Sequence, residues 1–152
     1  MKKTVYVILD NIRSALNTGS IFRTSETAGI DKLFLCGITP YPPHSKLAKT
    51  ALGTIEHVNW EYQKSAIEVI HSLKKEGFTI ISVEVDPRAV PYSSIRYPEK
   101  TCLIMGHELI GVNQDILNES DYIAQIPMHG EKNSLNVAVS YGIVVYESIR
   151  HQ

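Results

Sequence analysis

The sequence predicts an α/β fold in which a single domain holds a mostly parallel sheet, covered by helices on both faces. Short apolar runs rich in β-branched residues alternate along the 152 residues with segments of helical periodicity, the order expected of helices packed on a sheet. Several of the runs are continuously apolar, as in parallel strands that are buried on both faces. No internal repeat, low-complexity tract or change of composition marks a domain boundary, so we expect one compact core.

Five segments are predicted to be strands, because each is a short apolar run bounded by turn residues. They are residues 4–10 (TVYVILD), 32–37 (KLFLCG), 78–85 (FTIISVEV), 101–106 (TCLIMG) and 122–126 (YIAQI). Parallel neighbours require crossover connections of roughly a dozen residues or more. The segments between these runs are long enough to hold helices.

Three segments are predicted to be helical. From Ser65 to Glu76, apolar side chains recur at helical spacing among charged ones. After the first strand, a helix should begin near Asn17 and carry Arg23 about a turn and a half further along. The last helix follows a polar, glycine-containing loop and is apolar on nearly every side, so the sheet alone cannot cover all of its apolar surface.

The loops indicate where a ligand lies. Residues 38–46 (ITPYPPHSK) and 85–100 contain prolines and are predicted to be irregular. Glycine turns follow the last two strands, in residues 106–111 (GHELIG) and 128–134 (MHGEKNS). Ligands of open parallel sheets bind outside the carboxyl ends of the strands, so these two turns are expected to flank one pocket. Either turn taken alone is better explained as an ordinary strand exit, and no GxGxxG dinucleotide motif follows the first strand.

Composition and charge exclude several classes of protein. A formal net charge of −1, from 15 Lys+Arg and 16 Asp+Glu, means that a nucleic-acid partner must be met by a local basic patch. Cys36 and Cys102 lie inside apolar runs without zinc-ligand spacing, as expected of buried thiols in a reducing compartment. The first apolar run is short and is broken by Asp10, so neither a signal peptide nor a membrane span is predicted. We therefore expect a cytoplasmic protein.

Polar side chains beside these loops have simple explanations when each is taken alone. Arg23 fits a solvated helix face, Glu108 a turn or capping acid, and Ser134 the N-cap of the last helix. Asn17 and Asn136 complete the set. Taken together, and in this order along the chain, the five residues are not accounted for by these separate explanations.

Three segments resemble the motifs of the SpoU/TrmH-like RNA ribose 2′-O-methyltransferases of the SPOUT superfamily. They are N-x5-N-x-G-S-I-x-R-x5-G (11–29), G-x-E-x2-G (106–111) and I-P-M-x-G-x3-S-L-N-V-A-V-S-x-G-I-x2-Y-E (126–147). The resemblance implies a C-terminal trefoil knot, S-adenosylmethionine as the methyl donor without a metal, and an RNA substrate, either tRNA or rRNA. It also implies a homodimer, in which the last helix packs on a second subunit, and residues 1–152 as one SpoU-type domain with no appended RNA-binding domain.

The resemblance assigns roles by position. The family's polar catalytic positions correspond to Asn17, Arg23, Glu108, Ser134 and Asn136. Its donor-binding positions correspond to Val83, Gly106, Ile126, Met128, Ser134 and Leu135. His107 and His129 are interpreted as rim residues, and the six histidines contain no HxH or HxxxH pair that would indicate a metal site.

Two questions stay open at the level of sequence. Arg23 is either the base that takes the ribose proton or a clamp for an RNA phosphate, and we favour the clamp because a guanidinium keeps its charge. The charges of Arg13, Lys46 and Lys49 fit either RNA contacts or plain solvation, and from the sequence alone solvation is the stronger explanation. The alternative functions are a non-catalytic RNA- or nucleotide-binding module, and a flavodoxin-like signalling domain, which would need an acidic cluster where only Asp10 stands.

Overall fold

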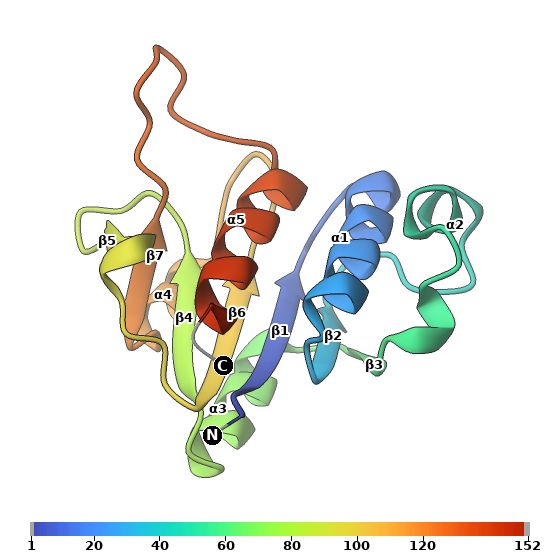
Figure 1. Cartoon of the computed structure of the whole chain (residues 1–152), viewed down its shortest axis with the longest axis horizontal. Coiled ribbons are helices and arrows are strands. Elements are labelled where there is room, and N and C mark those ends of the chain that lie inside the picture. The colour runs from blue at the N-terminus through green and yellow to red at the C-terminus, as the bar shows by residue number, and fades with distance from the viewer. Residues whose placement is uncertain (1, 151–152) are drawn as a thin grey trace.

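A computed structural model describes residues 2–150 of the chain and contains one seven-stranded sheet (Figure 1). The strands lie in the order β3 (Trp60–Gln63), β2 (Lys32–Cys36), β1 (Thr4–Asp10), β6 (Lys100–Met105), β4 (Thr79–Val83), β7 (Tyr122–Gln125) and β5 (Val90–Pro91). Every pairing between these strands is parallel. The predicted parallel α/β architecture is confirmed.

Helices cover both faces of the sheet, as predicted. Helices α1 (Ala15–Ala28) and α5 (Val137–Ile149) lie side by side on one face, and α3 (Ala66–Lys75) and α4 (Gln114–Asn118) lie on the other (Figure 1). The short helix α2 (Ser45–Ala51) packs on α1. Alternate side chains of the strands therefore enter two cores, and in β1 Val7 faces α1 and α5 while Ile8 faces α3. No helix within residues 2–150 combines the length and the apolar character needed to cross a membrane.

The five predicted strands are all present, and their observed ends differ from the predicted ones by at most two residues. Strands β3 and β5 were not predicted, because each lies at an edge of the sheet and carries polar residues or a proline. The prediction of irregular loops was wrong in part. Helix α2 begins within residues 38–46, and β5 and a 3-10 turn, Tyr92–Ser94, lie within residues 85–100.

The two cysteines confirm the expectation of buried thiols. Cys36 and Cys102 are free and buried in the core on the α3 side of the sheet. Burial, with the nearby carboxylates of Asp10 and Glu61, raises the pKa of Cys36 to about 12. Burial raises the pKa of Cys102 as well. Both side chains therefore remain protonated and unreactive at neutral pH.

Helix α1 is fixed by its caps and by close packing against α2. Its N-cap is Ser14, and it ends at Gly29, which adopts the left-handed conformation with φ 69°. Gly19 faces α2, where a Cβ would lie 2.1 Å from both the carbonyl oxygen of Leu47 and Oγ1 of Thr50. Only glycine allows the two helices to approach so closely. The first motif thus carries a glycine for helix packing.

Helix α5 is anchored to α1 by a buried polar contact. Tyr141 is fully buried, and its hydroxyl lies 2.7 Å from Oγ of Ser25 in α1. The N-cap of α5 is Asn136, whose side-chain oxygen accepts hydrogen bonds from the N–H groups of Ala138 (2.8 Å) and Val139 (3.1 Å). The N-cap role considered for Ser134 was therefore wrong, because Asn136 fills it.

Candidate functional site

A cavity of about 340 Å³ opens at the carboxyl ends of β4, β6 and β7, where the glycine turns were expected to meet. The exits of these strands, the loop before α5 and the first turn of α5 form its walls. The lining residues fall in the ranges 83–85, 105–111, 124–126 and 133–135, together with Met128, Val137 and Ser140. Its volume is within the usual range for small-molecule sites, about 300–1,000 Å³.

All six residues predicted to bind a donor line this cavity. They are Val83, Gly106, Ile126, Met128, Ser134 and Leu135. The structure therefore brings together side chains that lie in three separate loops. Glu84, Gln125 and Asn133 also line the cavity and were not predicted. Glu84 and Gln125 stand where β4 and β7 end, and a rule that marks polar residues at strand exits would have found both.

The loop after β6 keeps its shape through its own backbone. A Cβ at Gly106 would lie 2.7 Å from backbone atoms of Gly111 and Val112, so this glycine is required by the turn itself. The backbones of His107 and Gly111 exchange two hydrogen bonds, of 3.2 and 2.8 Å. Nδ1 of His107 accepts hydrogen bonds from the N–H groups of the next turn, Leu109 (3.0 Å) and Ile110 (3.3 Å). His107 thus lies at the cavity wall and also supports the loop.

Glu84 joins the loop after β4 to the loop after β6. Its Oε2 accepts a hydrogen bond from the N–H of Val112 (2.8 Å) and occupies the space beside Gly111, where a Cβ would lie 2.0 Å away. Gly111 has φ +76°, a conformation that other residues rarely adopt. Two walls of the cavity are therefore held together by one carboxylate.

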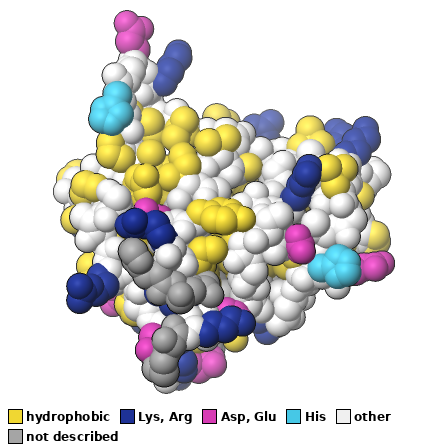
Figure 2. All heavy atoms as spheres, in the orientation of Figure 1, with side chains coloured by type: hydrophobic (Ala, Val, Ile, Leu, Met, Phe, Trp, Pro, Cys, Tyr) yellow, Lys and Arg dark blue, Asp and Glu magenta, His cyan; other side chains and the backbone are white. Residues whose placement is uncertain are grey.

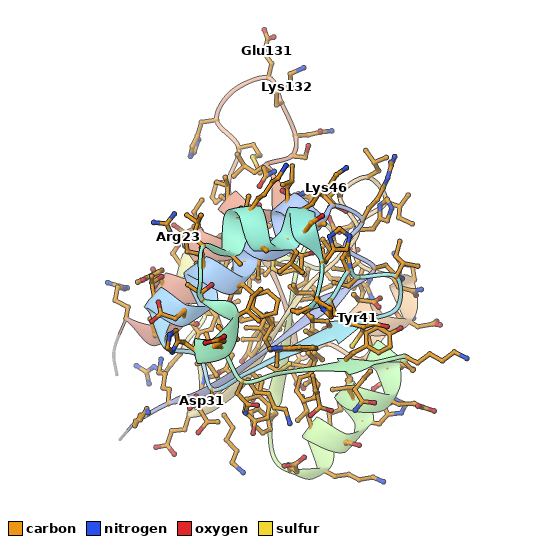
Figure 3. The ribbon with its side chains drawn as sticks, turned by 90° about the vertical axis from the view of Figure 1, so that its right-hand side faces the viewer. Arg23, Asp31, Tyr41, Lys46, Glu131 and Lys132 are labelled. Atoms are coloured by element: carbon orange, nitrogen blue, oxygen red, sulfur yellow. The ribbon has the colours of Figure 1, made fainter. Side chains whose placement is uncertain are left out.

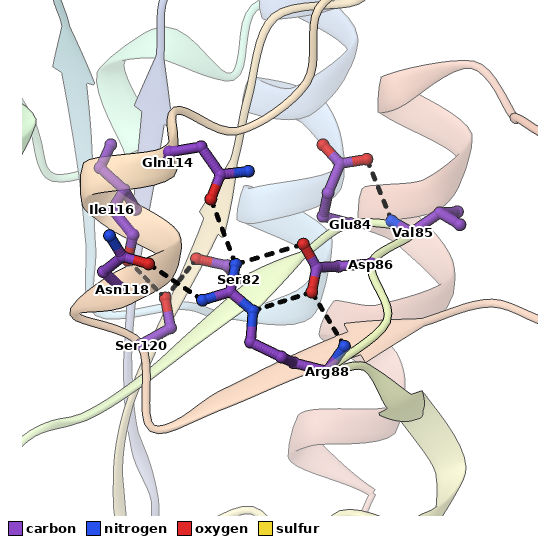
Figure 4. A network of polar contacts seen from close by, with 9 residues as sticks. All are labelled: Ser82, Glu84, Val85, Asp86, Arg88, Gln114, Ile116, Asn118 and Ser120. Carbon is purple, nitrogen blue, oxygen red and sulfur yellow. Dashed lines mark hydrogen bonds and ion pairs between the residues drawn. The ribbon is translucent and has the colours of Figure 1, made fainter.

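A second anchor, centred on Arg88, holds the loop after β4 (Figure 4). Nε of Arg88 donates to Oδ1 of Asp86 (2.9 Å), and Nη1 donates to Oδ1 of Asn118 (2.9 Å) at the end of α4. A longer hydrogen bond reaches Oε1 of Gln114 (3.3 Å). The side-chain and backbone hydrogen bonds of Arg88 lower the pKa of Asp86. The network ties Asp86, at the end of the segment 84–86, to α4.

A chain of polar contacts connects the three motifs next to the cavity. Glu108 accepts hydrogen bonds from the backbone N–H groups of Arg13 (2.8 Å) and Ser14 (2.9 Å) and from Nδ2 of Asn17 (3.1 Å). Oδ1 of Asn17 in turn accepts a hydrogen bond from Nδ2 of Asn136 (3.1 Å). We call Glu108, Asn17 and Asn136 the polar cluster. It joins the loop after β6 to the first turns of α1 and α5.

Glu108 is held as a carboxylate. Partial burial opposes its charged form, but the hydrogen bonds from Arg13, Ser14 and Asn17 outweigh that effect, so the pKa of Glu108 lies below its usual value. A carboxylate with three donors and a lowered pKa is a weak proton acceptor. Its geometry instead fixes the loop that precedes α1.

Arg23 lies apart from the cavity. Its side chain is exposed on α1 and is not among the lining residues. Six residues of helix separate it from Asn17, a rise of about 9 Å. Figure 3 shows Arg23 on the side of α1 opposite to Tyr41. Of the five predicted polar residues, the structure thus joins Asn17, Glu108 and Asn136, places Ser134 in the cavity wall, and leaves Arg23 outside.

Within residues 2–150, no group of three or more His, Cys, Asp or Glu side chains is arranged to hold a metal ion. His129 is exposed in the loop of residues 126–136, which projects from the molecule (Figures 1 and 2).

Comparison with known proteins links this site to one family. The tRNA (guanosine(18)-2′-O)-methyltransferase of Aquifex aeolicus is 30% identical over 155 residues, covering 99% of this chain and 71% of that protein. The AdoMet-bound rRNA methyltransferase from Sinorhizobium meliloti has a TM-score of 0.93 at 28% identity, over 99% of this chain and 57% of that one. A structure described as giving insight into 2-OH methylation of C/U34 on tRNA has a TM-score of 0.87 at 25% identity, over 97% and 95%.

The chain spans between 60% and 71% of the length of the first curated relatives that it matches. The sequence profile described as the SpoU rRNA Methylase family matches residues 4–146. This range contains the whole sheet, the cavity and the polar cluster. Because the match extends from β1 into α5, the chain belongs to the SpoU rRNA Methylase family.

Proposed function

We propose that this protein transfers a methyl group from S-adenosylmethionine to a ribose 2′-hydroxyl of tRNA or rRNA in the cytoplasm. The observation that carries the proposal is the cavity at the ends of β4, β6 and β7, beside the polar cluster. Family membership supports the reaction, and similarity to an AdoMet-bound rRNA methyltransferase supports the donor. The name of the Aquifex relative supports the 2′-hydroxyl as acceptor.

The cavity suits a ligand that has an apolar ring and a charged tail. Ile126, Met128 and Leu135 supply apolar surface, while strand-exit backbone groups and Glu84 supply hydrogen-bonding partners. S-adenosylmethionine brings an activated methyl group on its sulfonium. The protein then has to bind the donor, exclude water and place the acceptor oxygen in line behind the methyl carbon.

The polar cluster has little hydrogen-bonding capacity left for a substrate. One N–H of Asn17 is given to Glu108, and one N–H of Asn136 is given to Asn17. Each amide therefore retains one further N–H. We propose that these two N–H groups orient the ribose, and that Glu108 positions Asn17 without itself taking a proton.

Arg23 is proposed to bind an RNA phosphate and to stabilise the developing alkoxide. Its guanidinium keeps its proton, so the phosphate or a water molecule accepts the proton of the 2′-hydroxyl. Because Arg23 lies outside the cavity of its own chain, we infer that it acts on RNA bound at the cavity of a second subunit. Mixing an Arg23→Ala chain with a Ser134→Trp chain, which blocks the cavity, should then restore part of the activity.

A homodimer is supported by the exposed face of α5. Val139 and Tyr146 on α5 are 52% and 47% exposed, Leu135 just before the helix is 42% exposed and Leu16 on the adjoining α1 is 45% exposed, whereas Val144 is buried in the core. Figure 2 shows hydrophobic side chains exposed on this face of the molecule. A patch of this kind is unusual on a monomer. Light scattering should give twice the chain mass, and Val139→Asp should reduce it to that of one chain.

A trefoil knot in the C-terminal half is also proposed. Its support is the path of residues 84–99. After β4 the chain passes β7 to form β5 at the edge of the sheet, and it then returns to form β6, which lies on the opposite side of β4 from β7. The chain after β7 then comes back as α5 against β4 and β6. Stretching the unfolded chain from both ends should give an extension shorter than that of an unknotted chain of equal length.

The function itself is tested with purified protein. Calorimetry should show binding of S-adenosylmethionine or of its demethylated product without added metal. Incubation of donor and RNA from cells lacking the gene should produce 2′-O-methylnucleosides, detected by mass spectrometry. Donor binding without methyl transfer to any RNA would instead support a non-catalytic binding module.

A further inference from the structure

The loop after β2, residues 37–44, exposes two large apolar side chains. Ile38 is 64% exposed and Tyr41 is 48% exposed. We infer that these two side chains form a platform on which an unpaired base of the RNA substrate stacks. This inference rests on the proposed function and assigns part of the RNA-binding surface.

Tyr41 is supported by a second aromatic ring. Its ring packs against the ring of Tyr62, with centroids 4.6 Å apart and an interplanar angle of 39°. The hydroxyl of Tyr62 donates a hydrogen bond to the carbonyl of Gly37 (2.7 Å), which fixes the supporting ring. A ring that packs on a fixed neighbour and is still half exposed needs little ordering when a base stacks on it.

The platform is joined to the polar cluster by the backbone. The N–H of Ile38 donates to Oδ1 of Asn11 (3.0 Å), and the N–H of Ile12 donates to Oγ1 of Thr39 (3.0 Å). The next residues of that segment, Arg13 and Ser14, donate to Glu108. A continuous set of hydrogen bonds thus runs from the loop after β2 to the loop that lines the cavity.

The charge around the platform favours a polyanion over a protein partner. Residues 37–55, from the loop after β2 to the end of α2 and beyond, contain Lys46 and Lys49 but no Asp or Glu. Lys46, Lys49 and Arg13 are exposed, and Figure 3 shows Lys46 on α2. Basic side chains hold the phosphates, while an exposed aromatic ring offers a surface for a base.

An unpaired base is expected because the bases of an RNA duplex are already stacked and its deep major groove is closed to side chains. Bases in loops are free to turn outward onto an aromatic side chain. The platform therefore predicts that the methylated ribose lies in, or next to, a single-stranded or loop region. The lysines place the backbone, and the ring selects an unstacked nucleotide.

The experiment compares Tyr41→Ala with Tyr41→Phe and with Tyr122→Ala as a matched control. Tyr122 is similarly exposed (45%) but lies at the start of β7, away from the cavity. With total RNA from cells lacking the gene as the probe, Tyr41→Ala should weaken RNA binding by about 5- to 100-fold. Tyr41→Phe and Tyr122→Ala should bind RNA like the unaltered protein, and the affinity for S-adenosylmethionine should be the same in all.

A fluorescence measurement gives a second readout. The chain has one tryptophan, Trp60, so Tyr41→Trp in a Trp60→Phe background places a single indole on the platform. A single-stranded RNA oligonucleotide should quench it, and the matched duplex should not. Unchanged RNA affinity of Tyr41→Ala in a protein that methylates RNA, or equal quenching by strand and duplex, overturns the inference. Absence of methyl transfer by the unaltered protein overturns the proposed function instead.

Discussion

Replacing Glu108 by glutamine tests whether the polar cluster fixes the first motif. The carboxylate accepts hydrogen bonds from the N–H groups of Arg13 and Ser14 and from Asn17. Glutamine replaces one carboxylate oxygen with an NH2 group. That group is a donor that faces a backbone N–H, which is also a donor, so at least one hydrogen bond is lost. Hydrogen bonds to charged groups contribute roughly 1.5–3 kcal/mol. Because the side chain is partly exposed, losing one such bond should lower the free energy of unfolding by about 1–2 kcal/mol near neutral pH.

The effect should depend on pH in a defined direction. The pKa of Glu108 is lowered in the folded protein, so its stabilising contribution is complete above its unfolded pKa of about 4.3. The contribution is lost as the pH falls through the folded pKa. Glu108→Gln and the unaltered protein should therefore differ most near neutral pH, and their difference should shrink below about pH 4.

Urea unfolding at neutral pH and at about pH 5, pH 4 and pH 3 measures this difference, and the lowest pH lies inside the range where it should shrink. Glu131→Gln is the control, because Glu131 lies at the tip of the projecting loop (Figure 3). Glu108→Gln should also slow methyl transfer while the donor affinity stays within about two-fold, a change of less than about 0.5 kcal/mol. A stability difference that stays constant down to the lowest pH, or full activity of the variant, would refute the proposed role of Glu108.

Three further substitutions test other parts of the site. Arg23→Lys should bind RNA but transfer the methyl group slowly at every pH, since a lysine keeps the charge without the planar guanidinium. A single-turnover rate that rises steeply with pH would instead show that Arg23 acts as a base. Gly19→Ala should destabilise the fold by about 1–3 kcal/mol in urea unfolding, because its Cβ would collide with α2 at Leu47. Arg88→Ala should weaken donor binding several-fold in calorimetry, because it releases residues 84–86, and should leave the RNA affinity unchanged. An unchanged donor affinity would show that this network does not shape the cavity.

The parts of the fold that were predictable are those that burial on both faces imposes on the sequence. The strand residues 4–10 and 101–106 are nearly all apolar because helices cover them above and below. Edge strands escape this constraint: Trp60–Gln63 alternates with polar residues, and Val90–Pro91 is too short for a pattern. Periodicity alone therefore predicts the centre of the sheet and leaves its borders open.

The candidate site was predictable only where a motif or a family resemblance marked it. The residues of the cavity wall lie in three loops far apart in sequence, and no spacing rule joins them. The choice between Ser134 and Asn136 as the cap of α5 depended on backbone geometry that both residue types permit. The roles of Glu84 and Arg88 depend on which loops lie side by side in the fold, and a single sequence does not show which loops these are.

Asn136 has a consequence for how assembly and ligand binding depend on each other. One side chain caps α5, which carries the proposed dimer face, and also donates to Asn17 in the polar cluster. A ligand that orders this cluster then also orders the first turn of the helix that is proposed to join two chains. By thermodynamic linkage the coupling is reciprocal. If the donor or RNA multiplies the dimerisation constant by some factor, dimerisation multiplies the affinity for that ligand by the same factor. The fraction of dimer should rise with the concentration of S-adenosylmethionine, and donor affinity should rise with the concentration of protein.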